Sequence, residues 1–179
     1  MQSGPDIIRS DSQRRLLDHW ASQRDRASLP IWRGLNASEY KGPFDSLAVM
    51  QVVGEGGEAR FQIEYHGSRL AQAFGPVDCV GKFLDEILPS AYLRAAHATY
   101  RHVVSAKVPV YTVSDMRDPM GRIVHHERLL LPFSLGGGNI ERILASIEPF
   151  SPEGPFELRD LMTSPIRPPV IALCTTIQY

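Results

Sequence analysis

The chain has 179 residues, 43% of them hydrophobic and 22% charged, a composition typical of one globular domain with a sizeable core. Its formal net charge is -1, with 19 basic against 20 acidic residues, so the overall charge does not favour binding to nucleic acid or to an anionic membrane surface. No apolar run approaches the roughly 20 residues that span a bilayer, and the N-terminus lacks the pattern of a signal peptide, so a cytoplasmic location is expected.

The first predicted element is a helix over residues 11 to about 24. Leu16, Leu17 and Trp20 recur at helical spacing and form one apolar stripe. The stripe has two interpretations, packing on the helix's own domain or contact with a second copy of the chain in a homodimer. We treat residues 1–28 as a flanking helix and the three apolar residues as candidates for a dimer interface.

Two strands are predicted next, over residues 44–53 and 59–66, with a glycine-rich turn between them. In the second strand Phe61, Ile63 and Tyr65 alternate with polar residues. This alternation predicts a half-buried strand whose three apolar side chains face one core.

Helical segments follow. Two short ones are predicted over residues 67–75 and 82–88, and the longest helix is predicted over residues 91–106, with Ser90 as its cap. The apolar stripe of the long helix is predicted to consist of Leu93, His97, Tyr100 and Val104.

Three more strands are predicted over residues 108–116, 123–133 and 140–147, so the long helix is followed by an antiparallel meander. The composition changes after Phe150, where prolines become frequent. We treat residues 150–179 as a proline-rich tail that covers a sheet edge or engages a partner.

Several segments carry a family resemblance. They are Leu16–Trp20 in the leading helix, Phe61–Ser68, Val80–Pro89 and Glu127–Ser134. In this order they resemble the stand-alone PAS family found widely in alphaproteobacteria, over roughly residues 12–149.

This resemblance implies an α+β fold for residues 29–149, a PAS-like domain with a five-stranded antiparallel sheet and helices on one face, preceded by the flanking helix. It also implies a cavity between sheet and helices that holds a small ligand, and a sensory or regulatory role. The candidates for lining that cavity are Phe61, Ile63, Tyr65, Phe74, Phe83, Ile87, His97, Tyr100, Val110, Arg128 and Leu129. The alternative for most of the apolar and aromatic ones is an ordinary filled core.

Neither haem nor flavin is expected, and the cofactor, if there is one, is unknown. His97 is the one histidine of the long helix placed to bind haem iron, but a lone histidine on an apolar face is more often packed and hydrogen-bonded. Flavin photosensors of the PAS type carry a cysteine within the motif Asn-Cys-Arg-Phe-Leu-Gln. Here Val80–Asp85 stands in its place and Cys79 precedes it. Cys79 and Cys174 also lack the spacing of a metal site.

The densest polar cluster is His125–Arg128. On a strand, His125 and Glu127 share one face while His126 and Arg128 share the other. We interpret the cluster as an exposed strand face with one cross-strand ion pair, rather than as a metal site. If the face of Arg128 points inward, its guanidinium can bind a ligand carboxylate through two hydrogen bonds.

The function expected from these observations is a non-catalytic PAS-type sensory module, homodimeric, that binds a small molecule or a signalling protein such as a kinase. One alternative is a small enzyme with a cone-shaped α+β barrel that uses His97 or His125 in acid–base chemistry. The order of elements separates the two, because such enzymes begin with long helices, whereas here two strands precede the longest helix. Another alternative is an interaction scaffold that binds through its N-terminal helix and its tail.

Overall fold

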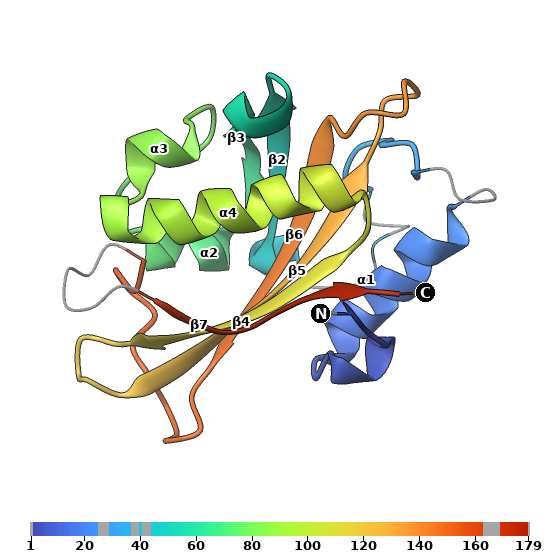
Figure 1. Cartoon of the computed structure of the whole chain (residues 1–179). Coiled ribbons are helices and arrows are strands. Elements are labelled where there is room, and N and C mark those ends of the chain that lie inside the picture. Colours follow the sequence, from blue (N-terminus) through green and yellow to red (C-terminus); the bar gives the residue numbers. More distant parts are fainter. Residues whose placement is uncertain (1, 25–28, 37–39, 41–43, 163–168, 179) are drawn as a thin grey trace.

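The computed structural model describes residues 2–24, 29–36, 40, 44–162 and 169–178, and its centre is a seven-stranded sheet with the order β1-β7-β4-β5-β6-β2-β3 (Figure 1). The strands are β1 (Gln2–Ser3), β2 (Leu47–Val53), β3 (Arg60–His66), β4 (Val110–Arg117), β5 (Ile123–Phe133), β6 (Arg142–Phe150) and β7 (Val170–Ile177). The α-helices are α1 (Asp11–Ser22), α2 (Ser68–Ala73), α3 (Leu84–Ile87) and α4 (Ser90–Ala106), and short 3-10 helices cover Pro5–Ile7, Phe44–Ser46 and Gly56–Glu58.

The α+β fold with a PAS-like antiparallel sheet is confirmed. The five predicted strands are β2 to β6, and they pair antiparallel in the order β3-β2-β6-β5-β4. The central strand β5 lies between β4 and β6, and its side chains are buried on both faces from Val124 onward with the exception of His125.

Two strands that were not predicted extend the sheet beyond β4. β7 pairs antiparallel with β4, and β1 pairs parallel with the end of β7, so the two ends of the chain lie side by side (Figure 1). The interpretation of the tail as a cover for a sheet edge is therefore confirmed for residues 170–177. Residues 163–168 of the predicted tail lie outside the described residues.

The sheet has a hydrophobic core on each face. On one face α2, α3 and α4 pack over side chains such as Met50, Phe61 and Leu130. On the other face α1 packs over side chains such as Tyr111 and Leu129. Because neighbouring residues of a strand point to opposite faces, β5 contributes to both cores through alternate residues.

The apolar stripe of α1 is buried within the chain itself. Leu16, Leu17 and Trp20 are between 0% and 4% exposed, and the Trp20 indole Nε1–H donates to the Pro132 carbonyl oxygen over 2.7 Å. This supports the intramolecular interpretation of the stripe, because in this arrangement none of the three side chains is on the surface for contact with a second chain.

Two details of the sequence reading are wrong. In α4 the buried stripe is Tyr92, Ala96, Thr99, Tyr100 and Val103, rotated from the predicted stripe, so Leu93, His97 and Val104 lie at its margin. In β3 a bulge interrupts the alternation, because the consecutive residues Val49 and Met50 pair with Tyr65 and Ile63. Tyr65 is thereby turned to the α1 face.

Among the described residues no helix is long and apolar enough to cross a membrane.

Candidate functional site

A cavity lies between the sheet and the helices α2, α3 and α4, where the PAS resemblance places a ligand. Its volume is about 60 Å³, several times the space that one water needs but well below the several hundred Å³ of a pocket for a drug-sized ligand. The apolar part of the wall comes mostly from Ala48, Met50, Ile63, Leu70, Leu84 and Ala96, which belong to β2, β3 and the helices above them.

Polar side chains enter the cavity wall from the central strands. The sheet register places Arg128 between Thr112 and Ile147 of the neighbouring strands, and it places His126 opposite Ser114. Directly paired residues of antiparallel strands point to the same face, so the side chains of Thr112, Ser114, His126 and Arg128 form one polar row beneath α4. The residues Ser114, His126 and Arg128 of this row line the cavity.

Arg128 is the cation of this row and is 8% exposed. Its Nε–H donates to the Thr112 hydroxyl over 3.2 Å, and within the described part of the chain it forms no ion pair with an acidic side chain. Burial lowers the pKa of Arg128, while Tyr100 and Cys174 oppose that change. The guanidinium stays protonated, because its ordinary pKa lies far above neutrality.

The histidines of the cavity are held in the neutral state. Burial lowers the pKa of His126 to about 3, and the neighbouring Arg128 charge acts in the same direction. Burial also lowers the pKa of His66, although Asp78 opposes this. The His66 ring contacts the Phe74 ring at 5.1 Å between centroids, and its Nδ1 has no hydrogen-bond partner among the described residues. At neutral pH the described residues of the cavity wall therefore carry one positive charge, on Arg128.

The structure brings four of the predicted cavity residues together. Ile63, Phe74, Tyr100 and Arg128 all line the cavity. From the sequence, Arg128 could bind a ligand carboxylate only if its side chain points inward. In the structure the side chain of Arg128 does point into the cavity.

Five other candidates lie on the same side of the sheet but do not line the cavity. Phe61 and Val110 belong to the filled core, and Ile87 packs against it. The Phe83 ring lies under the Arg60 guanidinium, 3.8 Å from the Cζ atom to the ring centroid. The His97 ring contacts the Phe61 ring at 6.0 Å between centroids.

Tyr65 and Leu129 lie on the opposite face of the sheet. Leu129 precedes Leu130 of the cavity-side core by one residue, so strand alternation sends its side chain toward α1. Tyr65 is turned to that face by the bulge in β3, and its hydroxyl donates to the Phe44 carbonyl oxygen over 3.2 Å.

Sequence reasoning missed several cavity residues. The alternation of residues 59–66 predicted His66 to lie on the polar face of its strand. In the structure the bulge in β3 turns the His66 side chain toward the cavity. Tyr92 lies one residue before the predicted stripe of α4, and Ser114 and Met116 alternate with exposed or half-buried residues of β4. The alternation of β4 was a usable signal for these two, whereas nothing local indicated the bulge.

The His125–Arg128 cluster is not the exposed strand face that we predicted. His126, Glu127 and Arg128 are buried, because β5 is a central strand with helices over both faces. The expected cross-strand contact is present, since His125 Nδ1 lies 2.7 Å from Asp115 Oδ1. The predicted division of the faces is confirmed, with His126 and Arg128 toward the cavity and Glu127 toward α1.

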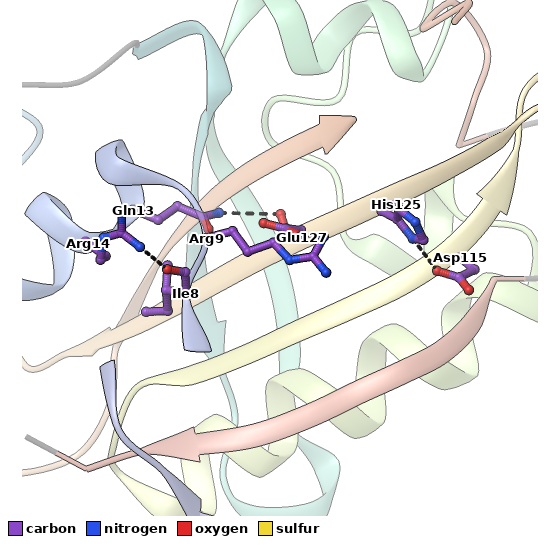
Figure 2. Close-up of polar contacts among 7 residues, drawn as sticks. All are labelled: Ile8, Arg9, Gln13, Arg14, Asp115, His125 and Glu127. Carbon is purple, nitrogen blue, oxygen red and sulfur yellow. Dashed lines mark hydrogen bonds and ion pairs between the residues drawn. The ribbon is translucent and has the colours of Figure 1, made fainter. Parts of the chain in front are cut away.

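On the α1 face, polar contacts attach the N-terminal segment to β5 (Figure 2). The Glu127 carboxylate lies 3.6 Å from the Arg9 guanidinium. The buried Gln13 amide donates to the carbonyl oxygens of Glu127 and Ser146 over 3.5 and 3.1 Å. Burial and the nearby Glu127 raise the pKa of Tyr111, so its hydroxyl stays protonated in this environment.

The described residues do not fit a haem or a metal ion. His97 does not line the cavity, and about 60 Å³ is far too small for a porphyrin. Among the described residues no group of three or more His, Cys, Asp or Glu side chains is placed to hold a metal. His97 and His125, the two histidines named for the enzyme alternative, lie on different faces of the sheet.

Comparison with known families agrees with this geometry. Residues 8–148 match the family described as PAS domain. The chain belongs to the PAS domain family. The matched region contains all of α1 and of β2 to β5 and most of the cavity wall. Met162 and Pro169 of the wall, and the strands β1 and β7, are outside it. A comparison with curated proteins gives no match.

Proposed function

We propose that this PAS domain is a non-catalytic sensory module that binds a small molecule in the cavity beneath α4. The observation that carries the proposal is a mostly apolar cavity into which a few buried polar side chains converge, with Arg128 among them. Ligand pockets generally combine an apolar wall with a small number of placed polar groups.

The proposed mechanism is a population shift. A ligand changes the balance between two arrangements of a protein only by binding one of them more tightly. The cavity wall includes residues of β4, β5, β6 and all of the helices α2 to α4, so a ligand there contacts most of the domain at once. The output is proposed to go to a signalling protein such as a kinase, or to a second copy of this chain.

Native mass spectrometry of the purified full chain tests the proposal. We expect an additional small mass that is lost after denaturation, and we expect Ala96→Phe, which fills the cavity, to remove it. Ala106→Phe at the end of α4 is the matched control, because Ala106 does not line the cavity. An added mass that persists in Ala96→Phe would place the ligand elsewhere and contradict the proposal.

A further inference from the structure

We infer that the ligand of this cavity is a small carboxylate whose oxygens are bound by the Arg128 guanidinium, an inference that rests on the proposed function and specifies its ligand class.

The first argument is the charge balance of the cavity. Arg128 is the charged side chain of the cavity wall, and the described wall residues include no aspartate or glutamate. A buried charge without a partner is strongly unfavourable in an apolar environment. A bound monoanion would neutralise this charge, whereas a neutral ligand would leave it unpaired and a cation would add to the repulsion.

The second argument is the donor geometry of Arg128. A guanidinium has five N–H donors, and the structure assigns one of them, at Nε, to the Thr112 hydroxyl. That bond orients the side chain within the polar row, and within the described residues the terminal amino groups have no acceptor. Two parallel N–H groups match the two oxygens of a carboxylate, which is the recognition that arginine performs better than lysine.

The third argument concerns the size and nature of the rest of the ligand. Beyond Arg128 the wall is mainly aliphatic and aromatic, with Met50, Ile63 and Phe74 around the space. A volume of about 60 Å³ admits only a compact molecule. A carboxylate with a short apolar chain satisfies both conditions, because its charged end pairs with Arg128 while its chain contacts the apolar wall.

Calorimetric titration of the dialysed full chain with propionate and butyrate tests the inference, with propionamide and butyramide as neutral analogues of the same shape. We expect the acids to bind about tenfold or more tightly than the amides, because hydrogen bonds between two charged groups are stronger than those to a neutral amide oxygen. Arg128→Met should abolish that preference, and the exposed Arg94→Met is the matched control that should keep it.

A second measurement separates a ligand-binding arginine from a structural one. In the ligand-free chain we expect Arg128→Met to raise the midpoint of thermal unfolding, because it replaces an unpaired buried charge by an apolar side chain of similar length. A lower midpoint would indicate that Arg128 stabilises the fold and would contradict the inference.

The outcomes separate the inference from the proposed function. If acids and amides bind equally well at the cavity, the carboxylate assignment is wrong while small-molecule binding stands. If neither acids nor amides bind and native mass spectrometry finds no added mass, both proposals are wrong.

Discussion

Glu127 and Arg128 are consecutive residues of β5 whose side chains leave the sheet on opposite faces. Arg128 lines the cavity beneath α4, while Glu127 lies beside Arg9 and its carbonyl oxygen accepts from Gln13 of α1 (Figure 2). One peptide unit of the central strand thus connects the candidate ligand site to the N-terminal helix. A shift of β5 at this point would displace side chains on both faces of the sheet.

The first prediction concerns the attachment of α1. Gln13 is fully buried and its amide donates to carbonyl oxygens of both β5 and β6. We expect Gln13→Ala to lower the free energy of unfolding by about 1–3 kcal/mol, because it removes these donors and leaves a small cavity. Urea denaturation measures the change. Arg15→Ala, at an exposed position of the same helix, should stay within about 0.5 kcal/mol of the wild type.

The second prediction concerns coupling across the sheet. We expect the effects of Gln13→Ala and Arg128→Met on the free energy of unfolding to be non-additive, with an interaction energy of about 0.5 kcal/mol or more. The reason is that the Gln13 side chain bonds to β5 at Glu127, and Arg128 is the next residue of that strand. A double-mutant cycle of unfolding free energies measures this term. Additive effects would show that the two faces respond independently and that α1 does not sense the cavity.

The third prediction separates the two interpretations of the α1 stripe. Leu17 is 0% exposed and packs within the core of its own chain. We expect Leu17→Ala to cost about 2–5 kcal/mol, with a melting temperature that does not depend on protein concentration. A concentration-dependent melting temperature of the wild type that is lost in the variant would instead indicate that α1 forms a dimer contact.

The fourth prediction is an acid sensitivity from buried histidines. The pKa of His126 falls from 6.5 to about 3 on folding. Between these values the unfolded chain binds a proton that the folded chain does not, so the contribution is complete above pH 6.5 and is lost as the pH falls toward 3. From pH 7 to pH 5 the loss from this residue is at most about 2 kcal/mol. Burial lowers the pKa values of His66 and His97 too, with the same sign.

Urea denaturation of the wild type and of His126→Gln at pH 7 and pH 5 measures this effect. The variant should lose less stability than the wild type over the same interval, whatever its stability at pH 7. The exposed His102→Gln serves as the control and should lose as much as the wild type. Equal losses in all three proteins would mean that His126 is protonated in the folded state.

Local patterns were sufficient for most of the fold. Alternation and turn residues predicted β2 to β6, and the apolar stripe of residues 11–24 predicted α1, because these patterns depend on neighbouring residues alone. β7 was not predicted as a strand, since its pairing with β4 joins residues distant in the sequence. The α1 stripe predicted a buried surface but could not say which surface covers it.

The candidate site was less predictable for the same reason. The alternation of β5 correctly placed Arg128 and His126 on one face, but it could not show that both faces of the strand are buried. His66 and Tyr65 exchanged their predicted faces through a bulge at Glu64, which depends on the register of β3 against β2. A single inserted residue reverses the face of every residue that follows it.

The last prediction concerns Gly67, which follows β3 directly and is adjacent to the cavity residue His66. An added Cβ at this position would overlap the carbonyl oxygens of Asp45 and Phe44. The Gly67 N–H also donates to the Leu47 carbonyl oxygen over 2.8 Å, so the backbone is held in place and cannot move aside. We expect Gly67→Ala to lower the free energy of unfolding by about 1–3 kcal/mol through overpacking.

Gly57→Ala is the matched control, because an added Cβ at Gly57 meets no atom within 4 Å. Both variants add one methyl group to a glycine near the same strand, so their difference isolates the steric effect. Urea denaturation should therefore separate them by at least about 1 kcal/mol. If Gly67→Ala were as stable as Gly57→Ala, the close approach of residues 44–45 to Gly67 would not be a constraint on the fold.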